Sequence, residues 1–266
     1  MSVPAKEVAR RPTGYASALR RVLAAERLKL RGTLALWMCL VAPALVVNVV
    51  VLQLLVSTQR GPPLSPTDAW ERLSLGVLGL WAFLMVPLYI TLQAALLAAL
   101  EHGSHQWRRL LALPIPRSAH YMSKLLALAT MMLAAQVLIT VLIPLGGLVL
   151  MAFKPGFGIA GAPPWTLLLT TSAGTFVATW LLLALHTWLA LRWQSFAVAC
   201  GVGMGATVMG FLIGQSADFG PWYPWSLPVQ MLSSSESKGT VLALSALGGL
   251  LVTALGAWNF ARRDHD

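Results

Sequence analysis

The sequence is poor in charged residues and in cysteine. Of its 266 residues, 11% are Asp, Glu, Lys or Arg and 57% are hydrophobic, and its mean hydropathy is +0.72. A soluble domain carries about 25% charged residues, so this composition excludes an ordinary soluble protein. Cys39 and Cys200 lie in apolar stretches without the spacing of a zinc site or a redox pair. This excludes a disulfide framework and predicts small core residues.

The sequence also lacks a phosphate-binding loop. The pattern Gly-x-x-x-x-Gly-Lys-Ser/Thr, in which backbone amides hold the phosphates of ATP, occurs nowhere in the chain. The chain therefore cannot bind ATP by that route. If ATP drives its activity, a separate nucleotide-binding protein has to supply the energy.

Six long stretches are nearly free of charge. They run approximately over residues 34–56, 75–100, 125–153, 165–191, 196–213 and 241–260. A bilayer core of about 30 Å requires about 20 helical residues, and these stretches lack the alternating pattern of barrel strands. Because backbone groups in hydrocarbon must pair within their own segment, the sequence predicts an all-α integral membrane protein with six transmembrane helices.

The positive charges lie between these stretches and are distributed unequally. With the N-terminus inside, 15 of the 19 Lys and Arg residues fall on the cytoplasmic side, and only Arg60, Arg72, Lys154 and Lys238 fall outside. Cytoplasmic loops are rich in Lys and Arg, so we expect both termini on the cytoplasmic side of the membrane. The net charge of +10 then indicates orientation and contact with anionic lipids, with no role for nucleic acid.

Residues 15–31, before the first span, have the pattern of a basic amphipathic helix. Hydrophobic residues recur at helical spacing and most arginines lie elsewhere, which predicts a helix along the membrane surface. Glu26 falls near the apolar stripe, where a lone carboxylate needs a cationic partner. Two partners are open: Lys29 in the same helix, or a basic residue of another segment.

The segment 101–124, between the second and third spans, is too long for a simple turn. Trp107 and Leu110 recur at helical spacing and Pro114 ends the pattern, so we expect a short cytoplasmic helix. Two roles are open for Trp107 and the two arginines after it. They dock onto another protein, since Trp and Arg often anchor interfaces, or they anchor to lipid headgroups.

Histidines in the same segment are a weak metal signal. His102 and His105 have the spacing that places two imidazoles on one helical face. No cysteine or third ligand completes the set, and Glu101 can pair with His105 one turn later. We therefore expect no metal site.

Three motifs in the chain together carry a family resemblance. The first is Ala-Glu-Arg-Leu-Lys-Leu-Arg at 25–31, and the third is Pro-Trp-Ser-Leu-Pro at 224–228. The second consists of Glu101, Trp107, Leu110, Leu113, Pro114, Arg117, Tyr121 and Lys124. Together these motifs resemble ABC-2 type transporter permeases, in particular the permeases of lantibiotic and bacitracin self-protection exporters.

The resemblance implies a subunit that dimerises with a second copy or a related chain. Residues 1–33 would form a cytoplasmic N-terminus whose elbow helix carries Glu26, Lys29 and Arg31. Residues 34–260 would form the transmembrane domain, and residues 261–266 a cytoplasmic tail. The implied function is export of a hydrophobic or amphipathic substrate, such as an antimicrobial peptide, and the implied location is a bacterial inner membrane.

The resemblance also implies how ATP drives the subunit. The segment 101–124 would be a coupling helix that sits in a groove of an ABC ATPase, and that ATPase would bind ATP and Mg²⁺. This chain itself would have no cofactor and no catalytic residue. The implied docking residues are Glu101, Trp107, Arg108, Arg109, Leu110, Pro114 and Arg117.

Glycines in the fifth span indicate close helix packing. Gly201 and Gly205, then Gly210 and Gly214, have Gly-x-x-x-Gly spacing, which lets helix backbones approach. Packing within the chain and a dimer seam are both open.

Two other classes of membrane protein fit the sequence less well. A secondary transporter needs carboxylates in its spans or an inverted repeat, and the six stretches contain no Asp or Glu and no evident repeat. An intramembrane enzyme needs paired catalytic groups, whereas His186 has no acidic or metal-binding companion. We expect His186 to serve helix packing.

Overall fold

The protein is a bundle of helices. The structure, a computed structural model, describes residues 14–58, 62–102, 115–193, 195–233 and 237–262, and every regular element in these ranges is helical. Six described helices are long and apolar enough to span a membrane: Leu34–Val56, Pro66–Glu101, Arg117–Phe153, Trp165–Arg192, Phe196–Ile213 and Lys238–Arg262. The prediction of an all-α membrane protein is confirmed.

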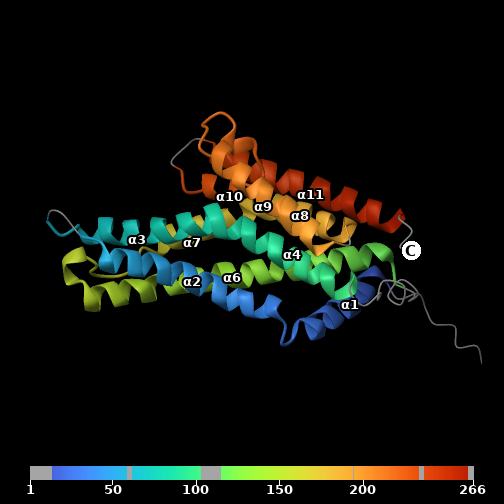
Figure 1. Ribbon diagram of the computed structural model, residues 1–266, viewed down its shortest axis with the longest axis horizontal. Helices are drawn as coiled ribbons and strands as arrows, with labels where there is room; N and C mark the ends of the chain where they lie inside the picture. The colour runs from blue at the N-terminus through green and yellow to red at the C-terminus, as the bar shows by residue number, and fades with distance from the viewer. Residues whose placement is uncertain (1–13, 59–61, 103–114, 194, 234–236, 263–266) are drawn as a thin grey trace, which may run out of the picture.

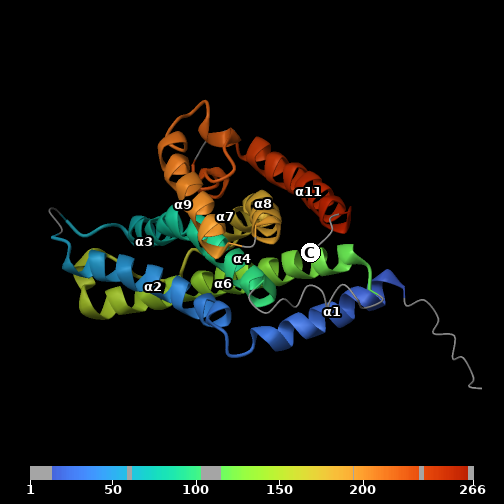
Figure 2. The same cartoon turned by 45° about the vertical axis from the view of Figure 1, so that its right-hand side comes forward.

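A short helix precedes the first span and lies at an angle to it. Helix α1 (Tyr15–Leu30) packs against α6 (Arg117–Phe153), and α2 (Leu34–Val56) follows it after a sharp turn (Figure 2). Gly32 in this turn has φ 73°, a left-handed conformation that glycine adopts without steric cost. The turn places α1 beneath one end of α6, which we call the α1 end of the bundle.

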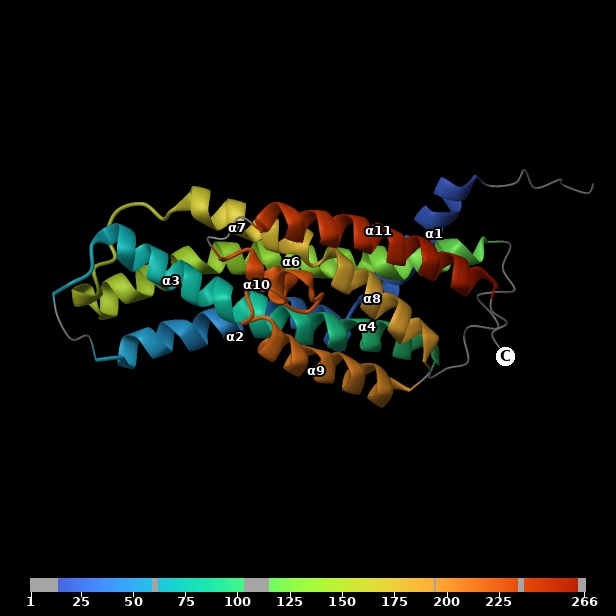
Figure 3. The same ribbon diagram turned by 90° about the horizontal axis from the view of Figure 1, so that it is seen from above.

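The second span is longer than its hydrophobic stretch and contains an irregular turn. It comprises α3 (Pro66–Leu80), the π-helical segment η1 (Trp81–Met85) and α4 (Val86–His102), which follow one another in Figure 3. Ser65 caps α3 by accepting a hydrogen bond from the Asp68 amide at 3.2 Å, and Pro66 suits the first helical position. Pro87 lacks the N–H that would pair with the Phe83 carbonyl, so the wider π turn lies directly before it.

Helix α6 is the central element of the bundle. With 37 residues it extends about 55 Å, more than the bilayer core needs. Trp81 on η1 donates from Nε1 to Gln136 at 2.9 Å, and the Tyr89 hydroxyl donates to the Met131 carbonyl at 3.2 Å. At the far end of α6, Gly147 lies against the ring of Trp70. These contacts fix the second span along α6.

The fourth span is broken in its middle. Helix α7 (Trp165–Ala178) and helix α8 (Trp180–Arg192) are separated by the single residue Thr179. Ser245 on α11 (Lys238–Arg262) donates to the Val177 carbonyl at 2.8 Å and accepts from the Leu181 amide at 3.2 Å. A side chain of another helix thus satisfies the backbone groups that the break leaves open, as hydrocarbon requires.

The chain after the fifth span folds back onto the bundle. Helix α9 (Phe196–Ile213) is followed by η3 (Gly220–Trp222) and α10 (Leu227–Gln230), and α10 packs against α7. The Tyr223 hydroxyl donates to the Ala206 carbonyl of α9 at 2.9 Å. The ring of Trp225 meets His186 of α8 edge-on, with 5.7 Å between centroids. This contact agrees with a packing role for His186.

Candidate functional site: a buried charge cluster between three helices

Three helices that are distant in sequence meet at the α1 end. The buried face of α1 repeats every four residues, at Ala18, Val22, Glu26 and Leu30, and α1 packs against α6. Glu26 therefore points at α6 with its apolar neighbours. The last turn of α4 and the first turns of α6 complete the meeting point (Figure 1).

Four charged side chains fill this meeting point. They are Glu26 and Lys29 of α1, Glu101 of α4 and Lys124 of α6, and we call them the charge quartet.

Each lysine of the quartet contacts both carboxylates. Lys124 Nζ lies 2.8 Å from Glu26 Oε2 and 2.5 Å from Glu101 Oε2, and the second contact is an ion pair without hydrogen-bond alignment. Lys29 Nζ lies 2.8 Å from Glu101 Oε1 and 3.2 Å from Glu26 Oε1. Lys124 also donates to the Leu97 carbonyl of α4 at 3.3 Å. The charges alternate in sign, and the two acids balance the two bases.

Burial makes this pairing necessary. Glu101 is 0% exposed, Glu26 3% and Lys124 4%, whereas the side chain of Lys29 is 26% exposed. An unpaired charge at such burial costs several kcal/mol. Desolvation lowers the pKa of Lys29, but its hydrogen bond to Glu101 and the charges of both carboxylates outweigh this, so its pKa is raised.

Both partners that the sequence left open for Glu26 are present. Lys29 binds one carboxylate oxygen from the same helix, and Lys124, 98 positions away, binds the other. Sequence reasoning did not identify Lys124 as the partner. Its only local signal is a lysine directly before a long apolar stretch.

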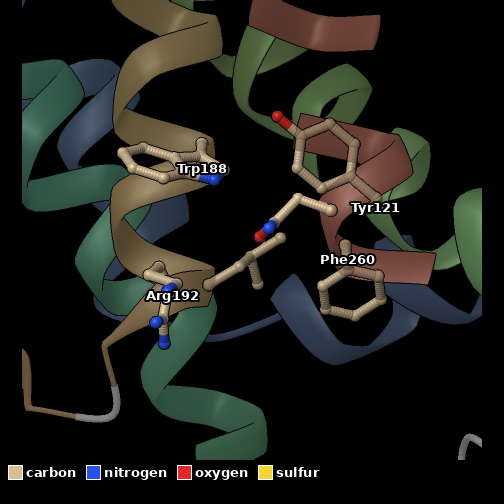
Figure 4. Close-up of a pocket in the computed structure, with 6 residues that line it drawn as sticks. Tyr121, Trp188, Arg192 and Phe260 are labelled. Atoms are coloured by element: carbon tan, nitrogen blue, oxygen red, sulfur yellow. The ribbon is translucent and has the colours of Figure 1, made fainter. Parts of the chain in front are cut away.

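Further contacts hold the start of α6 to α8 and α11. The rings of Tyr121 and Phe260 lie with their centroids 6.1 Å apart, and Arg117 donates to the Ala261 carbonyl at 3.4 Å. Figure 4 shows Tyr121 and Phe260 facing Trp188 and Arg192 of α8 across a small hollow. This hollow of about 10 Å³ holds at most one water. The start of α6 is therefore fixed on both sides of the bundle.

The predicted docking residues divide into two groups. Trp107, Arg108, Arg109, Leu110 and Pro114 lie outside the described residues, as does His105 of the candidate metal pair. Glu101 and Arg117 are described and contact the bundle, because Glu101 is fully buried in the quartet and Arg117 reaches α11. Of the elbow residues, Glu26 and Lys29 belong to the quartet, and Arg31 is exposed after α1.

The four glycines predicted to pack closely, in and just after the fifth span, differ in their surroundings. A Cβ atom on Gly201 or Gly205 would meet nothing within 4 Å. One on Gly210 would lie 3.0 Å from Trp225 Cβ, and one on Gly214 would lie 3.1 Å from Ser226 Cβ. Gly203 makes the closest contact with neighbouring spans, because a Cβ there would meet Thr91 at 2.4 Å. Gly201 and Gly205 thus face outward, whereas Gly210 and Gly214 face the segment that folds back.

Comparison with known families identifies the family of the chain. The family model of the ABC-2 family transporter protein matches residues 22–211. The chain belongs to the ABC-2 transporter family. The match covers most of α1, all of α2 to α8 and most of α9, and it includes all four residues of the quartet. No curated protein matches the chain.

Membership in the ABC-2 family defines the general role of the chain. The chain is a multi-pass membrane component of a transporter and is not itself catalytic. Membership in this family implies an ABC ATPase partner in general. The family match supports the ABC-2 resemblance and leaves the finer resemblance to lantibiotic and bacitracin exporters a prediction.

Proposed function

We propose that this ABC-2 family member is the permease subunit of an ATP-driven exporter for a hydrophobic or amphipathic substrate, such as an antimicrobial peptide. The α1 end faces the cytoplasm of a bacterial cell, and both termini lie there. The segment 101–124 docks on an ABC ATPase, which binds ATP and Mg²⁺. A second permease copy completes the membrane part.

The charge quartet is the observation that carries this proposal. Glu101 lies in the last turn of α4 and Lys124 lies near the start of α6, so the quartet joins both flanks of residues 103–114. The same four residues fix α1 to these flanks. Because breaking a buried ion pair costs about 3–5 kcal/mol, a push on the segment moves α1, α4 and α6 as one unit.

The packing of the bundle supports a second copy. Two hollows between its helices, one lined by α4, α8 and α9 and one by α4, α6 and α8, measure about 10 Å³ each. A substrate pocket commonly measures about 300–1,000 Å³. Neither of these two hollows can pass a peptide or lipid, and the larger groove of about 720 Å³ lies between α1, α2 and α6 on the flank of the bundle, so a path between two subunits is favoured.

Co-purification of the ATPase tests the docking assignment. The tagged full chain is expressed in its own host, extracted in mild detergent, and its bound proteins are identified by mass spectrometry. We expect a protein with a phosphate loop to accompany wild type and to be lost from a Trp107→Ala, Arg108→Ala double variant. Trp222→Ala removes an exposed tryptophan, 62% accessible, after the fifth span, and should retain the ATPase.

Two results would contradict this assignment. Equal amounts of ATPase on wild type and on the Trp107→Ala, Arg108→Ala variant would show that the segment is not the docking element. A wild-type chain that retains no ATPase at all would contradict the permease function itself.

A further inference from the structure

A groove runs along the flank of the bundle between α1, α2 and α6. It has a volume of about 720 Å³, within the range of small-molecule sites. Its walls are mainly hydrophobic and include Leu23 and Leu30 of α1, Leu36 and Leu40 of α2, and Met131 and Ala134 of α6. We call it the elbow groove.

The elbow groove reaches into the part of the chain that spans the membrane. Its α2 and α6 walls belong to two of the candidate spans, whereas α1 lies before the first of them. Leu36 is 47% exposed and Leu40 52%, so the groove opens on an apolar face. An acyl chain fits such a channel through van der Waals packing against the apolar walls, which is the packing that acts between apolar groups inside a bilayer.

The rim of the groove carries two arginines. Arg27 lies in the last turn of α1 and Arg31 directly follows the helix, and both line the groove and are exposed. The ion pairs found among the described residues all belong to the quartet, so neither arginine has a described acidic partner.

The acidic residue in the groove does not cancel this charge. Glu26 lines the wall, but Lys29 and Lys124 bind its two carboxylate oxygens. The quartet as a whole is neutral, so the charge that the rim presents is that of Arg27 and Arg31. Guanidinium groups bind phosphate oxygens in a bidentate manner, and anionic lipids concentrate such phosphates at the inner membrane surface.

In the part of the chain that the structure describes, a second copy offers this rim no accessible carboxylate. Side-by-side subunits in a membrane related by a two-fold axis bring equal ends together. The described carboxylates at the α1 end are Glu26 and Glu101, and both are buried in the quartet. The other described carboxylates, Asp68, Glu71 and Asp218, belong to the start of α3 and to the segment after α9.

We propose that the elbow groove binds one anionic phospholipid. Its phosphate lies between Arg27 and Arg31, and an acyl chain lies along α2 and α6. The proposal needs only a membrane location and does not depend on the transport function. The bound lipid would fill the space that the protein leaves open between α1, α2 and α6.

Native mass spectrometry of the purified full chain tests this site. The protein is titrated with phosphatidylglycerol and, separately, with phosphatidylcholine that has the same acyl chains. We expect one tightly bound phosphatidylglycerol. An Arg27→Gln, Arg31→Gln variant should bind it about 30-fold more weakly, because each basic residue at an anionic surface contributes about fivefold.

Two further variants separate a built site from general surface charge. Arg20→Gln with Arg21→Gln removes the same charge from exposed positions of α1 that do not line the groove, and its affinity should stay within about twofold of wild type. Ala134→Trp leaves the charge unchanged and fills the part of the groove proposed to hold the acyl chain, so it should reduce phosphatidylglycerol binding at least tenfold.

Three outcomes would overturn the proposal. Equal loss in the two arginine pairs would show diffuse attraction, and equal affinity for both lipids would remove the headgroup from recognition. If Arg27→Gln, Arg31→Gln abolishes a dimer and leaves lipid binding unchanged, the occupant is a second copy.

Discussion

The two lysines at the ends of α6 are stabilised by different kinds of partner. Lys124 lies near one end and Lys154 directly follows the other, so they stand about 45 Å apart along the axis. Lys124 is 4% exposed and pairs with two carboxylates from α1 and α4. Lys154 is half-buried and donates to the backbone carbonyls of Leu54, at 2.6 Å, and of Ser57, at 2.5 Å.

The difference shows what burial demands of a charged group. At the far end, the ammonium group of Lys154 meets the last carbonyls of α2, where the helix dipole is negative and water still reaches. Any sequence at those positions offers such carbonyls. At the α1 end, Lys124 itself is buried from water, so it needs full negative charges, and only particular side chains of two other helices supply them.

The largest expected effect is the loss of Lys124. In Lys124→Met the quartet keeps two carboxylates and one lysine, so one buried charge has no partner. We expect destabilisation of about 3–5 kcal/mol, measured by thermal unfolding in detergent with tryptophan fluorescence. Lys238→Met, at an exposed position, should change stability by less than about 0.5 kcal/mol. A similar small change in Lys124→Met would mean that the quartet contributes no stability.

A smaller effect is expected at the quartet member that water reaches. Lys29 is 26% exposed, so its removal in Lys29→Met lets water solvate Glu101 in part. We expect a loss of about 1–2 kcal/mol in the same unfolding assay. A loss as large as that of Lys124→Met would contradict the gradient of burial within the quartet.

The raised pKa of Lys29 gives this contribution a pH dependence. Since the folded-state pKa lies above the usual value of 10.5, the folded protein holds this proton more tightly than the unfolded chain does. The contribution is fully present below about pH 10.5 and is lost as pH rises through the folded pKa. Unfolding curves of wild type should therefore approach those of Lys29→Met in strong alkali, and a constant gap would contradict this pairing.

The smallest effect is expected at the other end of α6. In Lys154→Met the carbonyls of α2 lose a cation but remain open to water, so we expect about 0.3–1 kcal/mol. This loss should be the same in wild type and in a Lys29→Met background, because the two ends share no partner. Strong coupling between the two variants would show that the two ends of α6 are not independent.

The spans themselves could be predicted from sequence, but not all of their ends. Hydrophobic stretches located all six helices because the bilayer imposes both length and composition. The second helix begins at Pro66, before the stretch at residue 75, since its first turns carry Asp68, Glu71 and Arg72. A hydropathy pattern does not report helical turns beyond the hydrocarbon. The break at Thr179 carries no proline or glycine signal either.

The pairing within the site could be predicted only in part. The position of Glu26 on an apolar face required a cation, and Lys29 was within reach on the same helix. The contact with Lys124 depends on how α1 packs on α6, which local spacing does not encode. The same limit applies to the glycines, since Gly-x-x-x-Gly spacing selected Gly201 and Gly205, which have no close neighbour. The closest side-chain neighbours belong to glycines of other spans, Gly147, Gly249 and Gly256.

A double-mutant cycle between Glu26→Gln and Lys124→Met tests the central claim that opposite charges lock α1 to α6. Each single change leaves the quartet with one excess buried charge, whereas the double variant leaves Lys29 and Glu101 as a neutral pair. We predict that the double variant is more stable than the sum of the single losses by about 1–3 kcal/mol. Losses that add within about 0.5 kcal/mol would contradict the electrostatic lock.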